Sequence, residues 1–100
     1  MTHQIIKVGD NGVVFNLPVI SKGNRVSLVG ATIKVNFVTN KRKFTKDAVI
    51  IDDLNGLSRV TLTKTDLATP GMYWFQAVIT MENGNIYTSD DLNFKVEPRI

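Results

Sequence analysis

The stretch TPGMYWFQAVIT, residues 69–80, contains the most specific structural signal in the chain. Apolar side chains occupy every second position after its Pro-Gly turn: Tyr73, Phe75, Ala77 and Ile79. The positions between them are Met72, Trp74, Gln76 and Val78. A period of two is typical of a β-strand, because successive side chains of an extended backbone point to opposite faces. The stretch therefore predicts a long strand that is largely apolar on both faces.

Tyr73 follows the turn at Gly71 and precedes the inward position of Phe75 by two residues. This is the spacing of the tyrosine corner, in which the ring enters one end of the core and the hydroxyl bonds to backbone upstream. In antibody domains a Cys occupies the position of Phe75. The pattern here predicts an immunoglobulin-like core without a disulfide.

The rest of the chain consists mainly of short stretches of period two, rich in Val, Ile and Thr. We expect strands at Ile5–Val8, Val13–Leu17, Arg25–Leu28, Ile33–Phe37, Ala48–Ile51, Ser58–Thr63, Tyr73–Ile79, Ile86–Ser89 and Leu92–Val96. Turn pairs such as Asn55-Gly56 and Asn83-Gly84 separate them. The pattern predicts an all-β chain, an immunoglobulin-like antiparallel β-sandwich of about eight or nine short strands. Residues 1–100 are expected to form a single domain.

The composition excludes several kinds of chemistry. The 100 residues include no Cys and one His, His3, and the net charge is +3. Disulfides, thiolate nucleophiles and Cys-ligated metal sites are therefore excluded, as are metal sites that need two His ligands. No phosphate-binding glycine motif occurs, and the acidic residues lie in turn-like stretches. We expect no enzyme, no catalytic residue, no metal and no cofactor.

Two acidic pairs, Asp52-Asp53 and Asp90-Asp91, raise the question of calcium. Placing Gly56 at the sixth position of a calcium loop puts Ile51 first and Leu62 twelfth, so both essential carboxylates are missing. The second pair has no third acidic residue near it in sequence. We therefore predict that both pairs lie in turns that connect strands.

The stretch NKRKFTKD, residues 40–47, holds the one cluster of basic residues: Lys41, Arg42, Lys43 and Lys46. It could bind phosphate or an acidic partner, with Phe44 stacking on the ligand. Alternatively, it is a solvated hairpin loop whose Phe44 folds back onto the sandwich. We favour the loop, because no basic stripe runs along the chain, and expect no nucleic-acid binding.

Strict alternation sends Met72, Trp74, Gln76 and Val78 to the face opposite Tyr73. Val38 faces the same way on the strand expected to lie next to them. Trp and Met are typical of the centres of protein–protein contacts, so we predict a partner-binding site formed by Trp74, Met72, Val78, Val38 and Gln76. The alternative is that a loop or terminal strand of the chain covers Trp74.

Several segments, taken in order, resemble one family across nearly the whole chain. They are Ile5–Asp10 (IIKVGD), Val26–Ile33 (VSLVGATI), Asn55-Gly56, Leu67–Tyr73 (LATPGMY), Asn83–Ser89 (NGNIYTS) and Phe94–Val96. In this order and spacing the chain resembles the N-terminal domain of the phage baseplate upper protein. The resemblance implies a structural virion protein of a tailed phage that infects Gram-positive bacteria.

The resemblance implies an attachment module that joins a peripheral receptor-binding arm to the central tail hub during host attachment. The resemblance implies other tail proteins as partners, with the receptor-binding protein held by a C-terminal part that this sequence lacks. Family members run on beyond Pro98-Arg99-Ile100, so we expect either the N-terminal part of a longer protein or an unusually short relative. The expected location is the virion tail baseplate, assembled in the host cytoplasm, with no membrane contact and with homo-oligomerisation left open.

The alternative function is a carbohydrate-binding or adhesive β-sandwich module. Sugar binders need an exposed aromatic ring with polar groups beside it. Trp74 with Gln76 and Asn36 would satisfy that requirement. A bacterial surface or immunity-type module is a third option, and it is weakened because no signal peptide is expected.

Overall fold

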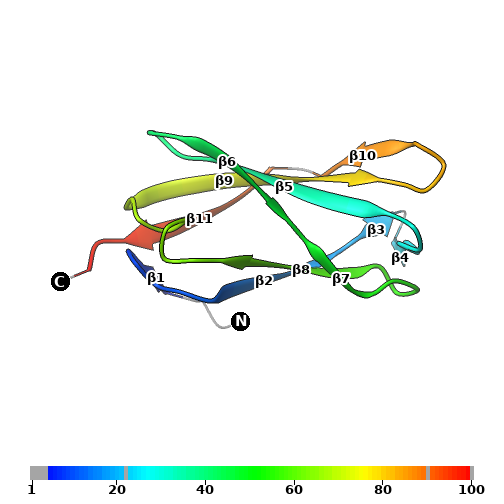
Figure 1. The fold of residues 1–100 in the computed structure, drawn as a ribbon, viewed down its shortest axis with the longest axis horizontal. Coiled ribbons are helices and arrows are strands. Elements are labelled where there is room, and N and C mark those ends of the chain that lie inside the picture. Colours follow the sequence, from blue (N-terminus) through cyan, green and yellow to red (C-terminus); the bar gives the residue numbers. More distant parts are fainter. Residues whose placement is uncertain (1–4, 22, 90, 100) are drawn as a thin grey trace.

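The computed structural model describes residues 5–21, 23–89 and 91–99 (Figure 1). His3 and Asp90 lie outside the described residues. The described residues form eleven strands and no helix, which confirms the all-β class. The strands are β1 (Ile6–Lys7), β2 (Val13–Pro18), β3 (Ile20–Ser21), β4 (Asn24–Arg25), β5 (Thr32–Val38), β6 (Lys43–Asp47), β7 (Val49–Asp52), β8 (Leu57–Leu62), β9 (Gly71–Thr80), β10 (Ile86–Thr88) and β11 (Leu92–Glu97). The number exceeds the expected eight or nine because β3, which is two residues long, and the edge strand β6 were not expected.

The strands form two facing sheets and a small hairpin. The larger sheet has the order β1-β11-β9-β5-β6, and β10 also pairs with β9. The smaller sheet has the order β2-β8-β7, and β3 pairs with β4. Neighbouring strands are antiparallel except β1 and β11, which are parallel. In Figure 1 the larger sheet lies above the smaller one, with the core between them.

Among the connections between the sheets, two lie on opposite sides of the core. β6 belongs to the larger sheet and continues through Ala48 into β7 of the smaller sheet. The N–H of Ala48 donates to the carbonyl of Ile33 at 3.0 Å, which holds the crossing point against β5. On the other side, β1 of the larger sheet leads into β2 of the smaller sheet. The side formed by β6 and β7 is therefore closed by continuous backbone (Figure 1).

Alternation along β5 and β9 builds the core. Ile33, Val35 and Phe37 are buried on β5, and Tyr73, Phe75, Ala77 and Ile79 are buried on β9, while the residues between them are less buried. Phe15 reaches from β2 to Phe75 and Phe94, with ring centroids 5.7 and 5.0 Å apart. The aromatic side chains therefore join the two sheets at one end of the core.

The tyrosine corner is present. The side chain of Tyr73 is fully buried, and its hydroxyl donates to the carbonyl oxygens of Thr69 at 2.7 Å and Asp66 at 3.2 Å. These hydrogen bonds attach the start of β9 to the turn that precedes it. They explain why a fully buried phenol is tolerated at this position.

Two sequence expectations about local structure were wrong. The strand expected at Arg25–Leu28 ends at Arg25, because the next backbone groups bond to loops: Val26 N–H donates to the Val19 carbonyl at 3.0 Å and Leu28 N–H to the Asp53 carbonyl at 2.6 Å. The stretch expected to be a loop around Phe44 contains β6 instead. β6 is an edge strand, where one inward apolar residue among polar ones is sufficient.

Candidate functional site: the outer sheet face around Trp74

The predicted binding residues lie together on the outer face of the larger sheet. Trp74 of β9 is directly opposite Val38 of β5, and their side chains are 40% and 39% exposed. Gln76 lies opposite Asn36, and Val78 opposite Lys34. Met72 lies beyond the end of β5 and is opposite Lys95 of β11. The described residues cover Trp74 only in part, so within this part of the chain no loop or strand buries it fully.

The polar groups around Trp74 bind one another. Gln76 Nε2 donates to Asp91 Oδ1 at 2.8 Å, and Thr45 Oγ1 donates to Asn36 Oδ1 at 2.8 Å. Lys34 Nζ forms an ion pair with Asp47 Oδ1, also at 2.8 Å. The face therefore presents an apolar centre beside polar side chains, several of which already bond to one another. Such a surface suits association by desolvation of apolar area.

The basic cluster sits at the turn between β5 and β6, and two of its members bind the protein itself. The Arg42 guanidinium lies 4.7 Å from the centre of the Phe44 ring, and Nη2 donates to the Thr65 carbonyl at 2.8 Å. Lys46 Nζ forms an ion pair with Asp66 Oδ2 at 2.7 Å. Phe44 stacks on Phe37 at 4.9 Å, so it does fold back onto the core.

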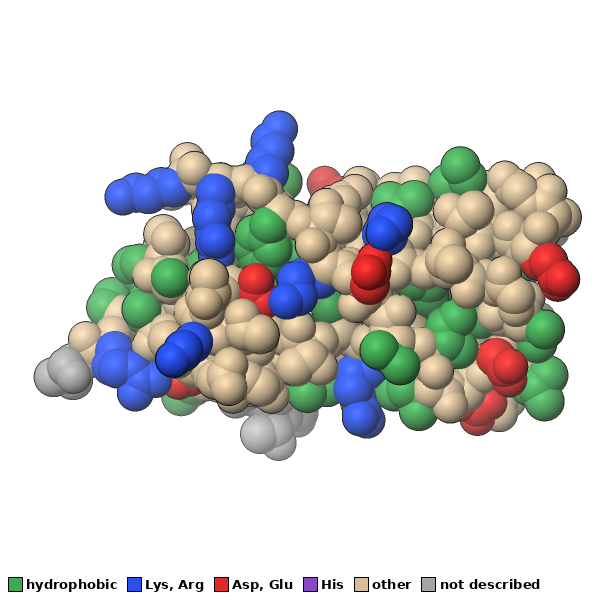
Figure 2. Space-filling view, in the orientation of Figure 1, with side chains coloured by type: hydrophobic (Ala, Val, Ile, Leu, Met, Phe, Trp, Pro, Cys, Tyr) green, Lys and Arg blue, Asp and Glu red, His purple; other side chains and the backbone are tan. Residues whose placement is uncertain are grey.

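Lys41 and Lys43 are exposed at this turn. Figure 2 shows several Lys and Arg side chains projecting at the end of the molecule where β6 begins.

Asp66 connects this turn to the tyrosine corner. Its carboxylate accepts hydrogen bonds from Lys46 Nζ and from the backbone N–H of Thr63, at 2.7 and 2.8 Å. Burial alone would raise the pKa of Asp66, but the hydrogen bonds from Lys46 and Thr63 outweigh it and lower the pKa from its ordinary 3.8. Folding therefore favours the ionised form of the Asp66 carboxyl group.

We expect Asp66 to make the folded state less stable in acid. The pKa of Asp66 is lower in the folded state than in the unfolded state. Such a carboxyl group stabilises the protein at pH values above its pKa in the unfolded state, and this contribution is lost as the pH falls through its pKa in the folded state. Urea unfolding of the wild type from about pH 6 to 2 should show the loss below about pH 4. Asp66→Asn should have a lower free energy of unfolding than the wild type at pH 6, and this free energy should change less with pH in this range. Asp47→Asn, at an exposed ion pair, is the control and should keep the wild-type profile. Parallel profiles for wild type and Asp66→Asn would contradict the assignment.

The Asp52-Asp53 stretch forms the predicted Asn-Gly turn between β7 and β8. Asn55 donates to the carboxylate of Asp52 through its backbone N–H at 3.3 Å and through Nδ2 at 2.8 Å. In the described ranges no group of three or more His, Cys, Asp or Glu side chains is arranged to hold a metal ion.

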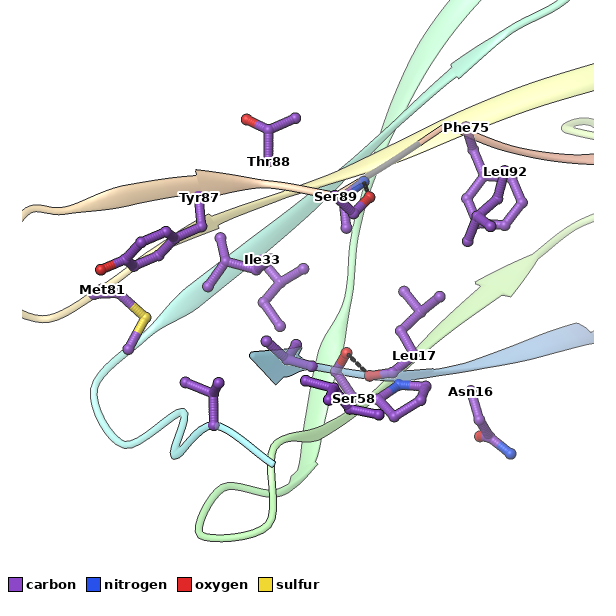
Figure 3. Close-up of a pocket in the computed structure, with 16 residues that line it drawn as sticks. Asn16, Leu17, Ile33, Ser58, Phe75, Met81, Tyr87, Thr88, Ser89 and Leu92 are labelled. Carbon is purple, nitrogen blue, oxygen red and sulfur yellow. Dashed lines mark hydrogen bonds between the residues drawn. The ribbon is translucent and has the colours of Figure 1, made fainter. Parts of the chain in front are cut away.

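A cleft that the sequence did not reveal opens between the sheets on the side of β2 and β10. Its volume is about 650 Å³, and Figure 3 shows Leu17 and Ser58 below it, Ile33 and Phe75 behind it, and Tyr87 and Met81 at one end. Tyr87 and Leu92 are 55% and 48% exposed although they point to the core side of their strands. Local periodicity places these two residues inward but does not show that the opposite wall is missing.

A comparison with protein-family models gives a match over nearly the whole chain. A family model described as the BppU N-terminal domain, from the phage baseplate upper protein, matches residues 2–100. The chain belongs to this family. The resemblance found in the sequence is thereby confirmed. A BppU N-terminal domain is a structural part of the phage baseplate, and it is a component of the virion tail that associates with other tail proteins.

Two further findings concern the chain. A search of the curated proteins finds no match to it. Within the described residues, no helix has the length and apolar character needed to span a bilayer.

Proposed function

We propose that this BppU N-terminal domain attaches a peripheral receptor-binding arm to the central tail hub, without catalysis, and that Trp74 is the centre of the contact. The supporting observation is the exposed Trp74–Val38 pair on a sheet face where Gln76 and Asn36 already bond to neighbouring side chains. Met72 and Val78 extend the apolar centre, and Gln76 lies at its rim.

The energetics favour such a contact. A Trp side chain buries about 150–250 Å² when it is fully covered, which corresponds to about 4–6 kcal/mol at about 25 cal/mol per Å² before the costs of association. About 40% of Trp74 is still exposed, so roughly 2 kcal/mol of this remains for a partner to gain. A modest contact suffices if several copies of the domain attach to the same tail, because linked sites bind with a high effective concentration.

The family match supports a wider setting for the domain. In this proposal residues 1–100 form one attachment domain of a longer baseplate protein, assembled in the host cytoplasm, with receptor recognition located elsewhere in that protein. The tyrosine corner and the two facing sheets support an immunoglobulin-like sandwich as the fold of the attachment domain. Lys41 and Lys43 would contribute at the rim of the contact.

Replacing Trp74 by Ala tests this proposal. We expect Trp74→Ala to weaken binding to the purified tail hub protein of the same phage by about 10- to 100-fold, because truncating an aromatic residue at the centre of an interface costs about 1.4–2.8 kcal/mol or more. Isothermal titration calorimetry measures the Kd. Because more than half of Trp74 is already covered by the sheet, thermal unfolding of the variant is measured alongside, to confirm that it is folded at the temperature of the titration.

Leu54→Ala is the matched control, because Leu54 is 71% exposed and lies on the turn between β7 and β8. This variant should bind like the wild type. Equal affinity of Trp74→Ala and the wild type would refute the role of Trp74, and absence of any binding by the wild type would refute attachment to the hub.

The carbohydrate-binding alternative has a separate test. Gln76 and Asn36 each already make a hydrogen bond within the sheet face, so a sugar would have to compete with these bonds. Titration with host-wall polysaccharide should therefore leave the fluorescence of the single Trp unchanged. A saturable shift would favour the sugar-binding function instead.

A further inference from the structure

The cleft lies where the wall between the two sheets is incomplete. On the opposite side, continuous backbone from β6 to β7 joins the sheets. On the cleft side, β1 pairs with β11 only at Val96 and Glu97 before the chain passes to β2. Along the rest of β11 and along β10, none of the described residues forms a further strand. Among the described residues, the larger sheet thus has a strand-wide vacancy beside β10 and β11, on the N-terminal side of β1.

The backbone of β10 points hydrogen-bonding groups into this vacancy. Ser89 N–H donates to the Ala77 carbonyl at 2.9 Å, and Met81 N–H donates to the Asn85 carbonyl at 2.7 Å. Residues 85, 87 and 89 therefore face β9. Because adjacent residues in a ladder face opposite neighbours, Ile86 and Thr88 turn their N–H and C=O groups to the open side.

The backbone of β11 continues the same edge. Val8 N–H donates to the Glu97 carbonyl at 2.9 Å, so the backbone of Glu97 faces β1. By the same alternation Asn93 faces this side too, beyond the end of β1. Leu92 is four positions after Thr88, whereas their partners Val78 and Phe75 are three positions apart, so β10 and β11 follow one another along β9 with a one-residue register shift.

The other rim of the cleft is the free edge of β2. Val19 N–H donates to the Gly56 carbonyl at 2.8 Å, and the register with β8 then directs the backbone of Val14 and Asn16 outward. Pro18 has no N–H to offer, which makes this edge the poorer template for a strand. A strand entering the cleft would therefore pair with β10 and β11 and lay its side chains towards β2.

We propose that the cleft receives one extended segment of a partner tail protein, which pairs with β10 and β11 and completes the larger sheet. Backbone pairing supplies affinity in this mode of recognition, and the side chains at alternate positions supply specificity. This contact is on a different surface from Trp74 and does not depend on the role proposed for that residue.

The lining defines the chemistry of the segment. None of the described residues that line the cleft carries a charge, and the walls are largely apolar, with Phe75, Ala77, Ile79 and Leu17 among them. A charged side chain would lose its hydration there without gaining a partner. The inward residues of the segment should therefore be uncharged and apolar, of the β-branched kind that strands favour. Covering the exposed surfaces of Tyr87 and Leu92 adds apolar burial to the backbone hydrogen bonds.

A photo-cross-linker at position 87 in assembled phage tails tests the proposal. Replacing Tyr87 by p-benzoylphenylalanine keeps an aromatic ring at the rim of the cleft (Figure 3). After irradiation, mass spectrometry should find cross-links to one short uncharged segment of another tail protein. Cross-links to a second copy of this chain, to residues 1–4 of the same chain, or to no protein would each overturn the proposal.

The pair Thr88→Pro and Thr88→Ala tests the backbone pairing directly. Thr88→Pro removes an N–H that does not bond to β9, whereas Thr88→Ala retains it. The cross-link from position 87 should fall at least about tenfold with Thr88→Pro and stay at the wild-type level with Thr88→Ala. The thermal unfolding of each isolated variant serves as the folding control. If Thr88→Pro is folded and still cross-links at the wild-type level, pairing along β10 is refuted. If it is unfolded, hydrogen exchange of the wild type decides: the Thr88 amide must be protected at least about tenfold more in assembled tails than in the free chain.

Discussion

Phe37→Ala is expected to lower the free energy of unfolding by about 3–5 kcal/mol, as for other buried Phe residues that are truncated to Ala. Phe37 is fully buried in the middle of the larger sheet. Its ring stacks on Phe44 at 4.9 Å and on Phe75 at 5.4 Å, so it links the edge strand β6 to the central strand β9. The free energy of unfolding of small domains is about 5–15 kcal/mol, so this loss would remove a large part of the stability.

The neighbouring residue provides a matched control. Val38 is on the same strand but points to the outer face, where its side chain is 39% exposed. We expect Val38→Ala to cost less than about 1 kcal/mol, because little buried volume is lost. Urea unfolding followed by the fluorescence of Trp74 measures both variants. Equal losses for the two variants would show that the alternation assigned to β5 is wrong.

The central strands could be predicted because their signal is local. β9 carries alternating apolar residues on a long uninterrupted stretch, and the tyrosine corner needs only the spacing from Gly71 to Tyr73. The placement of Trp74 and Val38 on the same face could also be predicted, because alternation on two adjacent strands determines which residues share a face.

The edge strand and the cleft could not be predicted from the same pattern. In β6 only Phe44 packs on the core, and the charged residues around it are typical of loops as well as of edge strands. The cleft depends on the position along β11 at which β1 begins to pair, and on the register shift between Thr88 and Leu92. These are properties of pairing between distant segments, which periodicity within one segment does not determine.

Gly56→Ala is expected to lower the free energy of unfolding by about 2–5 kcal/mol, for two separate reasons. Gly56 has a φ of +67°, a conformation that costs other residues about 1–2 kcal/mol. A Cβ at this position would also lie 2.3 Å from the carbonyl oxygen of Val26 and 3.0 Å from that of Val19. These are backbone atoms, so relief requires a shift of the segment that carries β3 and β4, at about 1–3 kcal/mol.

Gly12→Ala separates the two costs of Gly56→Ala. Gly12 has a similar φ, +76°, but a Cβ there would meet nothing within 4 Å. It should therefore cost only the conformational part, about 1–2 kcal/mol. The difference between the two variants in urea unfolding measures the close approach of the Asn55-Gly56 turn to Val26. Because Val19 and Val26 also line the cleft, Gly56→Ala should move that wall, and the cross-link from position 87 should weaken with it. Equal destabilisation by the two substitutions would mean that the turn is not pressed against this segment in solution.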